Sequence, residues 1–485
     1  MSFGWYIPKC SYFDQKDVKV LADSAIRIFE RSIWTIHGTD EFMEALRNFG
    51  CDIDGSKVRF SRQVIDKTLD RISNAKIENS GMLQPKAGTA APTNVTCATS
   101  GQGLYTCDIE TDNLREATCK DLADFSRVVN AYPGLDRYHP TLIPQDAPLM
   151  TRDLHALVTI MLNSDKPYKV SAYSTQIIKH FVEAYTIYYG SRKDGINNMH
   201  IPCLVYINTP FTIAKEPIES AMLVRSINNK PLTYYSMPVV GVMTPVTYSG
   251  TLALAAAEVL GINVISLAID DQVCCWCSDP VGFDMKTARD LMMGPEILAI
   301  RTAQTHLAEY FFGNEPSFQL PIYTSANVPG AQSMFERAFA IGMNFLAGVR
   351  HFQRGIGNLA NADVGSIVQL ALDMEIINSI KHMAKGFDVT TAELDEDFIV
   401  DTANKGSQFL ESENTLDNYR KFQWMPELMN RQYTMAWFKD PVDMLQNARL
   451  KARHLTDTAP NLCPLDNAAK TELATLLAAA DKELS

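Results

Sequence analysis

The sequence predicts an α/β protein with a (β/α)8 barrel, a TIM barrel, at its centre and helical extensions at both ends. From residue 104 onward, short apolar or β-branched runs alternate with helical stretches of about 12 to 25 residues, which is typical of βα units and a parallel sheet. Eight such runs precede residue 365, and eight parallel strands close a barrel. The 485 residues, 46% of them hydrophobic, are enough to bury such a core. The same alternation allows an open doubly wound sheet as the alternative.

We expect three regions: an N-terminal helical region with a small hairpin and a linker (1–103), the barrel (104–365), and a C-terminal helical extension packed on it (366–485). In the first region, apolar stripes over 17–33 and 40–48 predict amphipathic helices. Asp54-Gly55 between two short alternating runs predicts a hairpin, and Ser61 is expected to cap a third helix. Residues 80–103, rich in Gly, Ala, Thr and Pro, are expected to form a loop.

The elements of the barrel follow in order along the chain. Its strands are predicted over 104–108, 138–143, 168–172, 203–207, 232–240, 264–269, 319–323 and 349–353. Helices between them are predicted over 121–131, 152–163, 175–189, 213–228, 251–260, 284–312 and 331–346. Beyond the barrel we expect an amphipathic helix over 368–385, an aromatic-rich segment, and an Ala-rich helix near 468–484.

Composition excludes several classes of function. The 44 basic and 56 acidic residues give a net charge of −12, which argues against a general nucleic-acid binder. The uncharged stretch 231–257 is long enough to cross a membrane, but its Pro and Gly residues would leave backbone groups unsatisfied in lipid. We therefore expect a buried strand, a loop and a helix there, and no membrane partner. Because the N-terminus lacks a signal-peptide pattern, we expect a cytoplasmic protein with reduced cysteines.

In a barrel enzyme, the active site lies at the carboxyl ends of the strands. The residues selected by this rule are mostly aromatic, with few charges. Ring faces stabilise a quaternary ammonium ion, which has no hydrogen-bond donors; the alternative is that these side chains only pack the barrel. The candidates for substrate binding are Tyr105, His139, Tyr173, Tyr206, Asp271, Trp276, Arg350, His351, Phe352 and Arg354.

Cys274, Cys275 and Cys277 are the candidate metal ligands, because closely spaced thiolates can hold zinc when further ligands join them. The sequence has no second Cys-x-x-Cys and no compact Cys/His cluster, so we predict no tightly bound metal. It also has no Gly-x-Ser-x-Gly nucleophile elbow. A zinc-dependent enzyme that uses this cysteine segment remains the alternative.

Five segments are similar to motifs of one known family. They are the Gly241 to Gly250 segment with the helix that runs on to Glu258, Ser164-Asp165-Lys166-Pro167, the helix start from Ala331 to Glu336, Leu372-Asp373-Met374-Glu375, and the tail from Trp424 to Arg431. Through these segments nearly the whole chain resembles the trimethylamine methyltransferase (MttB) superfamily of corrinoid-dependent methyltransferases. The resemblance implies a (β/α)8 barrel that passes a methyl group from an amine to the cobalt of a corrinoid held by a separate protein.

Founding members of this family insert pyrrolysine and use trimethylamine, whereas the corresponding stretch here, placed within 324–332, holds only standard residues. The resemblance therefore implies a member that uses a quaternary amine. A quaternary nitrogen leaves as a neutral amine and needs no adduct-forming residue, so Co(I) supplies the nucleophile and the protein supplies orientation and desolvation. We expect glycine betaine as the substrate and dimethylglycine as the product, with proline betaine and carnitine as alternatives.

A betaine carboxylate needs a basic partner, and a guanidinium can bind it with two hydrogen bonds. Arg350, His351 and Arg354 are the candidates, although alternation along a strand prevents Arg350 and His351 from both facing inward. Gln332 and Glu336, one helical turn apart, are the candidate catalytic residues. The expected partners are the quaternary amine, a cognate corrinoid protein and further copies of this chain. A non-enzymatic binder of quaternary ammonium ions on the same barrel is the rival from another class.

Overall fold

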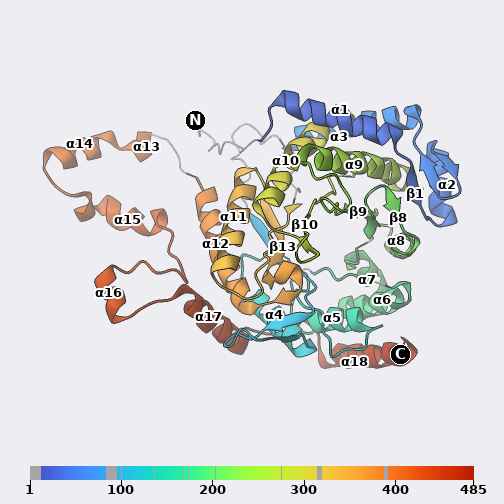
Figure 1. Ribbon diagram of the computed structural model, residues 1–485. Coiled ribbons are helices and arrows are strands. Elements are labelled where there is room, and N and C mark those ends of the chain that lie inside the picture. The colour runs from blue at the N-terminus through green and yellow to red at the C-terminus, as the bar shows by residue number, and fades with distance from the viewer. Residues whose placement is uncertain are drawn as a thin grey trace.

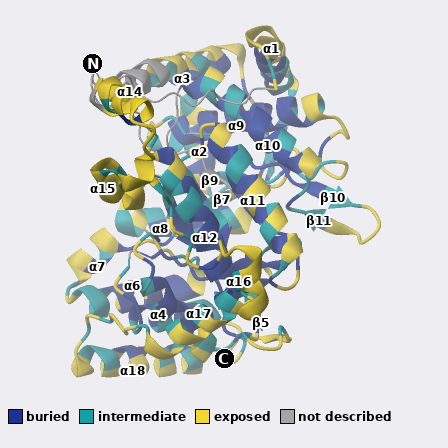
Figure 2. Ribbon diagram, turned by 90° about the vertical axis from the view of Figure 1, so that its left-hand side faces the viewer, coloured by how far each residue is buried: buried dark blue, intermediate teal, exposed yellow. Residues whose placement is uncertain are grey.

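The computed structural model describes residues 12–83, 95–99, 101–135, 137–166, 168–172, 174–202, 204–274, 276–313, 319–386 and 391–484. It is a helix-rich mixed α/β protein in which helices surround short parallel strands (Figure 1). Buried residues concentrate around these strands and on the inner faces of the helices, while exposed residues lie on the outer faces (Figure 2).

The N-terminal region has the predicted helices and hairpin. Its elements are α1 (Gln15–Arg31), β1 (Trp34–Ile36), α2 (Asp40–Phe49), β2 (Asp52–Asp54), β3 (Lys57–Arg59) and α3 (Arg62–Leu83). The turn between β2 and β3 holds Gly55 at a φ of +57°, and the Ser61 hydroxyl accepts a hydrogen bond from the Val64 N–H, as expected for a cap. Because β1 pairs in parallel with β8 (Thr212–Ile213), this region is joined to the centre of the protein.

The central strands pair in parallel along two arcs. In the first arc, β13 (His351–Ile356) lies between β12 (Gln319–Leu320) and β4 (Thr96–Thr99). Single parallel bridges continue this arc from Ala98 to Arg137 and from Tyr138 to Tyr168. In the second arc, β7 (Leu204–Ile207) pairs with β9 (Thr233–Ser236), and Ser236 bridges to Ser278. The predicted strands near 203–207, 232–240, 319–323 and 349–353 are therefore confirmed.

Helices follow these strands. They are α4 (Cys119–Asn130), α5 (Arg152–Met161), α6 (Thr175–Tyr189), α7 (Arg192–Asn198), α8 (Lys215–Asn228), α9 (Tyr248–Asp270), α10 (Pro295–Phe312) and α11 (Ala331–Leu346). The predicted bounds of α6 and α11 are confirmed to the residue. For α6, the Ser174 hydroxyl caps the first turn and Gly190 ends the last turn at a φ of +75°.

The strand predicted over 264–269 is wrong, because this segment belongs to the 23-residue helix α9. Buried residues occupy nearly every position of α9 from Thr251 to Leu267, so the sequence has no amphipathic period there. Within the part of the chain that the structure describes, α9 is the one helix long and apolar enough to cross a membrane, with a mean hydropathy of 2.1. However, 83% of that apolar window is buried inside the protein, as expected for a core helix.

Two further elements differ from prediction. The strand predicted over 104–108 exists as β5 (Tyr105–Cys107), but it belongs to a separate small sheet, in which it forms a hairpin with β6 (Leu114–Glu116). The strand that joins the central arc is β4, inside the predicted loop 80–103. The helix predicted over 284–312 begins only at Pro295. A second hairpin, β10 (Gly282–Asp284) and β11 (Arg289–Leu291), precedes it. Both hairpins are local insertions that a count of alternating runs does not distinguish from βα units.

The short strands β14 (Asn358–Leu359) and β15 (Val364–Gly365) follow β13, and the C-terminal region begins with the predicted helix α12 (Ile367–Ala384). Helix α17 (Met444–Thr458) packs on α12, and α18 (Asn467–Leu484) packs on α6. Between α12 and α17, the helices α13 (Thr391–Leu394), α14 (Glu396–Asn404), α15 (Glu413–Phe422) and α16 (Thr434–Lys439) project from the body (Figure 1).

Candidate active site

Two tyrosines face the same side of the paired strands β7 and β9. Tyr206 and Tyr235 are direct partners in the parallel register, and their ring centroids lie 6.3 Å apart in an edge-to-face arrangement. Their neighbours Val205 and Tyr234 are buried, as alternation along a strand requires. Tyr206 is 42% exposed. The face with the two tyrosines is therefore accessible, and Tyr206 offers an aromatic surface to a ligand.

Arg354 covers the second ring. Its guanidinium carbon lies 4.3 Å from the centroid of the Tyr235 ring, a cation–π contact. The residue has a φ of +62° and falls where the pairing of β13 with β4 shifts register, between Phe352 and Ile356. An irregularity of this kind redirects a side chain, here toward Tyr235. Among the described residues the guanidinium makes no hydrogen bond, and the side chain is 31% exposed, so its donors are available.

Asp279 links this pair to a second arginine. Its Oδ2 atom accepts a hydrogen bond of 2.9 Å from the Tyr235 hydroxyl and lies 3.9 Å from Nη1 of Arg354. Its Oδ1 atom accepts a 2.8 Å bond from Nε of Arg301, a buried residue of α10. The formal charges of two guanidinium groups and one carboxylate sum to about +1. This local surplus favours an anionic group on a ligand.

Tyr323, just after β12, completes the group. Burial raises the pKa of Tyr323, while the positive Arg354 opposes that shift and Asp279 adds to it, so the ring lies within electrostatic range of both. Burial likewise raises the pKa of Tyr235 well above its usual value. Both phenols therefore stay protonated at neutral pH. We call this set the arginine–tyrosine cluster: Tyr206, Tyr235, Asp279, Arg301, Tyr323 and Arg354.

His139 lies within electrostatic range of the cluster. Burial lowers its pKa to about 3, and the positive charges of Lys169, Arg137 and Arg354 add to the effect. The backbone N–H of His139 donates to the Thr99 hydroxyl, which donates in turn to the His139 carbonyl. The imidazole is therefore neutral at physiological pH and adds no charge to the site.

The depressed pKa of His139 predicts a loss of stability in mild acid. An unfolded histidine titrates near pH 6.5, so between about pH 6.5 and 3 the unfolded state binds the extra proton. From pH 7 to pH 5 this contribution lowers the free energy of unfolding by about 2 kcal/mol. Urea unfolding at both pH values should show a smaller loss for His139→Gln. Equal losses in the two proteins would contradict the assignment.

Trp276 is the other candidate near the cluster. Its Nε1 donates to the Ser278 carbonyl at 2.9 Å and to Oε1 of Gln304 at 3.2 Å. Ser278 bridges to the end of β9 and directly precedes Asp279, so the indole is fixed beside the strand that carries Asp279. Tyr173 lies outside the described residues.

Several predicted residues lie apart from the cluster. Asp271 caps the C-terminus of α9, with a side chain that is 79% exposed and paired with Arg71 at 2.7 Å. It was selected because a strand was wrongly expected before it. Tyr105 lies on the β5–β6 hairpin and is 42% exposed. The structure brings neither residue to the arginine–tyrosine cluster.

The other predicted residues in or next to strand β13 pack in the core or form hydrogen bonds with their neighbours. Arg350 precedes the strand, donates to the carbonyls of Phe345 and Val349 at 2.8 and 2.9 Å, and stacks on the Phe345 ring. Phe352 is fully buried in the core. His351 shares a hydrogen bond with the Thr96 hydroxyl of β4. Of the three basic candidates for the carboxylate, Arg354 is therefore the one in the cluster.

Gln332 and Glu336 contact each other on α11, where Nε2 of Gln332 donates to Oε1 of Glu336 at 3.0 Å. The other oxygen of Glu336 accepts hydrogen bonds from the Thr324 hydroxyl and from the Ser325 N–H. The pair thus orders the loop after β12, next to Tyr323, and we keep its catalytic role as a prediction.

Glu258, which ends one of the family-like segments, is a buried framework residue. It accepts hydrogen bonds from the Thr209 and Ser236 hydroxyls and from the Phe211 N–H, at 2.9, 2.5 and 3.1 Å. Burial raises its pKa. Because these partners follow β7 and end β9, Glu258 holds together the strand ends that present the two tyrosines.

Two other family-like segments meet in space. The Glu375 carboxylate of α12 accepts the N–H groups of Leu428 and Met429 at 2.9 and 3.2 Å. Its neighbour Asp373 accepts the Gly357 N–H at 2.8 Å and pairs with Arg337, and both side chains of that pair are fully buried. The resemblance therefore rests largely on residues that fix the fold around the site.

The structure describes two of the three cysteines that the sequence offers as metal ligands. Cys274 and Cys277 are partly buried and form no disulfide with another described cysteine, and Cys275 lies outside the described residues. Within the described ranges, no three His, Cys, Asp or Glu side chains are close enough to hold a metal ion.

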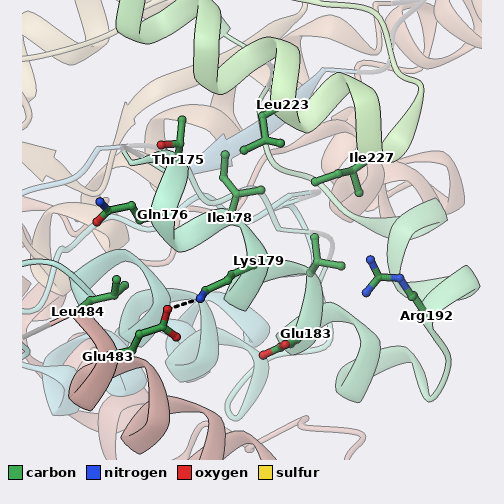
Figure 3. Close-up of a pocket in the computed structure, with 11 residues that line it drawn as sticks. Thr175, Gln176, Ile178, Lys179, Glu183, Arg192, Leu223, Ile227, Glu483 and Leu484 are labelled. Carbon is green, nitrogen blue, oxygen red and sulfur yellow. Dashed lines mark hydrogen bonds and ion pairs between the residues drawn. The ribbon is translucent and has the colours of Figure 1, made fainter.

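A separate pocket of about 750 Å³ lies between α6, α8 and α18 (Figure 3). An ion pair between Lys179 and Glu483 bridges it, and its lining contains no aromatic ring. A cavity without ring faces does not suit a quaternary ammonium ion. We therefore place the candidate site at the arginine–tyrosine cluster, where aromatic rings and available guanidinium donors occur together.

Reasoning from sequence missed four members of the cluster. Asp279 and Arg301 were missed because the sixth strand was placed over 264–269, so its end was misplaced by about ten residues, more than the usual boundary error. Tyr235 lies inside the predicted strand 232–240 and Tyr323 is the last residue of the predicted strand 319–323, whereas the candidates for these two strands were taken from the residues that follow them. The alternation of buried and accessible positions along β9 is the signal that could have identified Tyr235.

The structure is a helix-rich mixed α/β fold in which the arginine–tyrosine cluster lies near the ends of parallel strands. Comparison with known families assigns the class. The family of trimethylamine methyltransferase (MTTB) matches residues 5–485, so this chain belongs to that family and is a methyltransferase.

Three curated relatives are similar over most of the chain. "Glycine betaine methyltransferase" of Desulfitobacterium hafniense (strain Y51) is 23% identical over 456 residues, which cover 92% of each protein. "Trimethylamine methyltransferase MttB" of the same species is 24% identical and covers 70% of this chain and 67% of that protein. "Proline betaine:corrinoid methyltransferase" of Eubacterium limosum is 22% identical and covers 87% of each.

Proposed function

We propose that this methyltransferase takes a methyl group from glycine betaine, releases dimethylglycine, and passes the methyl group to the Co(I) corrinoid of a cognate protein in the cytoplasm. The names of the glycine betaine and proline betaine:corrinoid relatives support this reaction class. Family membership alone leaves trimethylamine as a second candidate, because one relative carries that name. The arginine–tyrosine cluster favours a betaine.

The observation that carries the proposal is Arg354. Its charge is only partly balanced by Asp279, which also pairs with Arg301, so the local charge of the cluster is positive. A betaine carboxylate would neutralise this surplus and accept two hydrogen bonds from the guanidinium. Trimethylamine has no carboxylate, and its protonated form would be repelled.

Tyr206 would hold the other end of the substrate. Its exposed ring lies beside Tyr235, whose face Arg354 occupies, so it offers a free aromatic surface near the carboxylate site. A quaternary nitrogen is attracted to such a face without donating a hydrogen bond. Trp276 is a further candidate for the wall of this cage. Held at both ends, the substrate would present one methyl group toward the acceptor.

The side chains account for the proposed transfer without an acid catalyst. The amine leaves as a neutral molecule, so no proton is required at the nitrogen, and His139 has none to give at neutral pH. The tyrosine hydroxyls keep their protons, and Asp279 is already bonded to Tyr235 and Arg301. Orientation and exclusion of water are therefore the contributions that we assign to this chain.

The corrinoid would approach from the ends of the strands, and when bound it supplies the cobalt nucleophile for the methyl group. Exposed apolar side chains follow β9 and β12 on that side, which suits contact with one face of the corrin ring. They are Val242, Met243, Val246, Tyr248 and Val328. The residues present therefore fit a corrinoid delivered by a partner protein.

A site at the ends of parallel strands is typical of a (β/α)8 barrel. We propose that the two arcs of parallel pairing belong to one closed (β/α)8 barrel, with the N-terminal and C-terminal helical regions outside it. The arcs together contain eight parallel positions in chain order, near residues 96, 137, 168, 204, 233, 278, 319 and 351. That number and order support closure.

A substrate comparison tests the proposal. The purified chain is incubated with cob(I)alamin and each of glycine betaine, proline betaine, carnitine and trimethylamine, and methylation of the corrinoid is followed by absorbance. We expect the highest rate with glycine betaine. Binding of betaine without methyl transfer would favour the non-enzymatic binder, and substantial turnover of trimethylamine would contradict the role of Arg354. Stoichiometric zinc, lost together with activity in Cys277→Ala, would favour the zinc enzyme.

Variants of Tyr206 test the aromatic contact. Tyr206→Phe keeps the ring face and is expected to change the Kd for glycine betaine by less than about threefold. Tyr206→Leu removes the face and should raise the Kd by about 3- to 30-fold, the range for a cation–π contact of about 0.5 to 2 kcal/mol. Titration calorimetry measures both. A larger loss for the phenylalanine variant than for the leucine variant would assign the contact to the hydroxyl instead.

A further inference from the structure

Residues 391–440 form an arm that leaves the body and returns to it (Figure 1). We call this segment the arm; it contains α13, α14, α15 and α16. It is fixed to the body near Leu428, which is 2% exposed and whose N–H donates to Glu375. On either side of this anchor, the helices of the arm point away from the barrel region.

The arm has almost no core of its own. In α15 no residue is buried, and in α14 only Thr402 is. These helices have 10 and 9 residues, and isolated helices of that length are marginal in water without packing on one face. The arm therefore needs a surface that covers it.

The side chains of the arm are unusually apolar for an exposed segment. Its large exposed residues include Leu410, Leu416, Phe422, Tyr433 and Phe438, which are 76, 80, 85, 73 and 66% exposed. Figure 2 shows α14, α15 and α16 mostly in the colour of exposed residues. Aromatic residues and leucines gathered in this way are typical of a permanent interface and would otherwise cause aggregation.

Charge divides the arm into two complementary halves. Residues 391–417 contain eight acidic and one basic residue, a net charge of −7. Residues 418–440 contain four basic and two acidic residues, a net charge of +2. A twofold axis brings the same surface of two subunits together, so that each contact occurs twice. The acidic half of one arm can then face the basic half of the other.

We propose that the arm is an interface between two copies of this chain, in which the arms pack against each other with acidic halves facing basic halves. A corrinoid protein must associate and dissociate in every catalytic cycle, and such transient interfaces are usually small and polar. The apolar arm has the character of an obligate homodimer interface instead. This inference does not depend on the identity of the amine substrate.

The first experiment compares assembly of apolar variants by light scattering after gel filtration. The wild-type chain should have twice the mass of one chain at micromolar concentration, and Leu416→Asp with Phe422→Asp should be a monomer. Leu149→Asp is the matched control, because Leu149 is 74% exposed outside the arm, and it should remain a dimer. A monomeric wild type, or a dimeric double variant, would overturn the proposal.

The second experiment changes the charge of each half of the arm. One variant carries Asp395→Lys, Glu396→Lys and Asp397→Lys, and the other carries Arg420→Glu, Lys421→Glu and Lys439→Glu. The first set reduces the negative charge of residues 391–417 from −7 to −1 and removes most of the attraction, whereas the second changes residues 418–440 from +2 to −4 and makes the two halves repel. Self-association of both variants should therefore weaken, by about 100-fold or more for the second. When mixed, the two variants should form a 1:1 heterodimer, which native mass spectrometry detects. Variants with misfolded arms could not form this heterodimer, so its formation also shows that the arms are folded. Variants that stay separate, or wild-type chains that assemble only when a corrinoid protein is added, would refute the dimer contact.

Discussion

Replacing Arg354 with leucine is expected to raise the Kd for glycine betaine by about 10²- to 10⁴-fold. The substitution removes two hydrogen bonds between charged groups, each of about 1.5 to 3 kcal/mol, and 1.36 kcal/mol corresponds to a factor of ten. Tetramethylammonium, which has a quaternary nitrogen and no carboxylate, should bind the variant at least as well as it binds the wild type, because a repelling cation has been removed. Titration calorimetry with both ligands measures the difference.

Arg350→Leu provides the matched control in the same stretch of chain. Arg350 bonds to the carbonyls of Phe345 and Val349 and has no place in the arginine–tyrosine cluster. Its removal should leave the ratio of the two dissociation constants unchanged. If Arg354→Leu weakened both ligands equally, or if Arg350→Leu lost betaine binding selectively, the carboxylate would have to lie elsewhere.

Asp373→Ala is expected to cost about 3 to 5 kcal/mol of unfolding free energy, because it leaves the buried Arg337 without its opposing charge. Asp373 also accepts hydrogen bonds from the Gly357 N–H and from Nε2 of Gln369, at 2.8 and 2.7 Å, so its loss leaves these two buried donors without an acceptor. Urea unfolding monitored by circular dichroism measures the change.

Asp363→Ala is the control for this effect. Asp363 pairs with Arg289, but both side chains are about half exposed, so the loss should be below about 1 kcal/mol. Equal losses at the two positions would mean that the buried pair is no more important than a surface pair. A stabilising effect of Asp373→Ala would contradict the assignment of Arg337 as a buried cation.

The sequence predicted elements best where a local rule determines them. Helix α6 was placed to the residue because Ser174 and Gly190 mark its ends and one face is polar. For helix α9, only the part over 251–260 was predicted. Because nearly all sides of this helix are buried, its sequence lacks the amphipathic period that marks a surface helix. Strand β4 was missed because it is four residues long and lies in a Gly- and Thr-rich segment.

The candidate site was harder to predict because its members meet only in three dimensions. Arg354 and Tyr206 were found, since each lies near the end of a predicted strand. The bond between Arg301 and Asp279 joins a helix to a strand end that had been misplaced, and no local pattern indicates it. The family-like segments were recognised easily, yet Glu258, Asp373 and Glu375 hold the framework. A motif can therefore identify a family without marking the residues that contact the substrate.

A crystal structure of the protein with glycine betaine tests the central claim most directly. The account predicts the carboxylate within hydrogen-bond distance of the Arg354 guanidinium, about 2.7 to 2.9 Å, and the quaternary nitrogen within about 6 Å of the centre of the Tyr206 ring. A betaine bound beside Arg350, or in the pocket between α6 and α18, with Arg354 still stacked on Tyr235 and free of ligand, would contradict it.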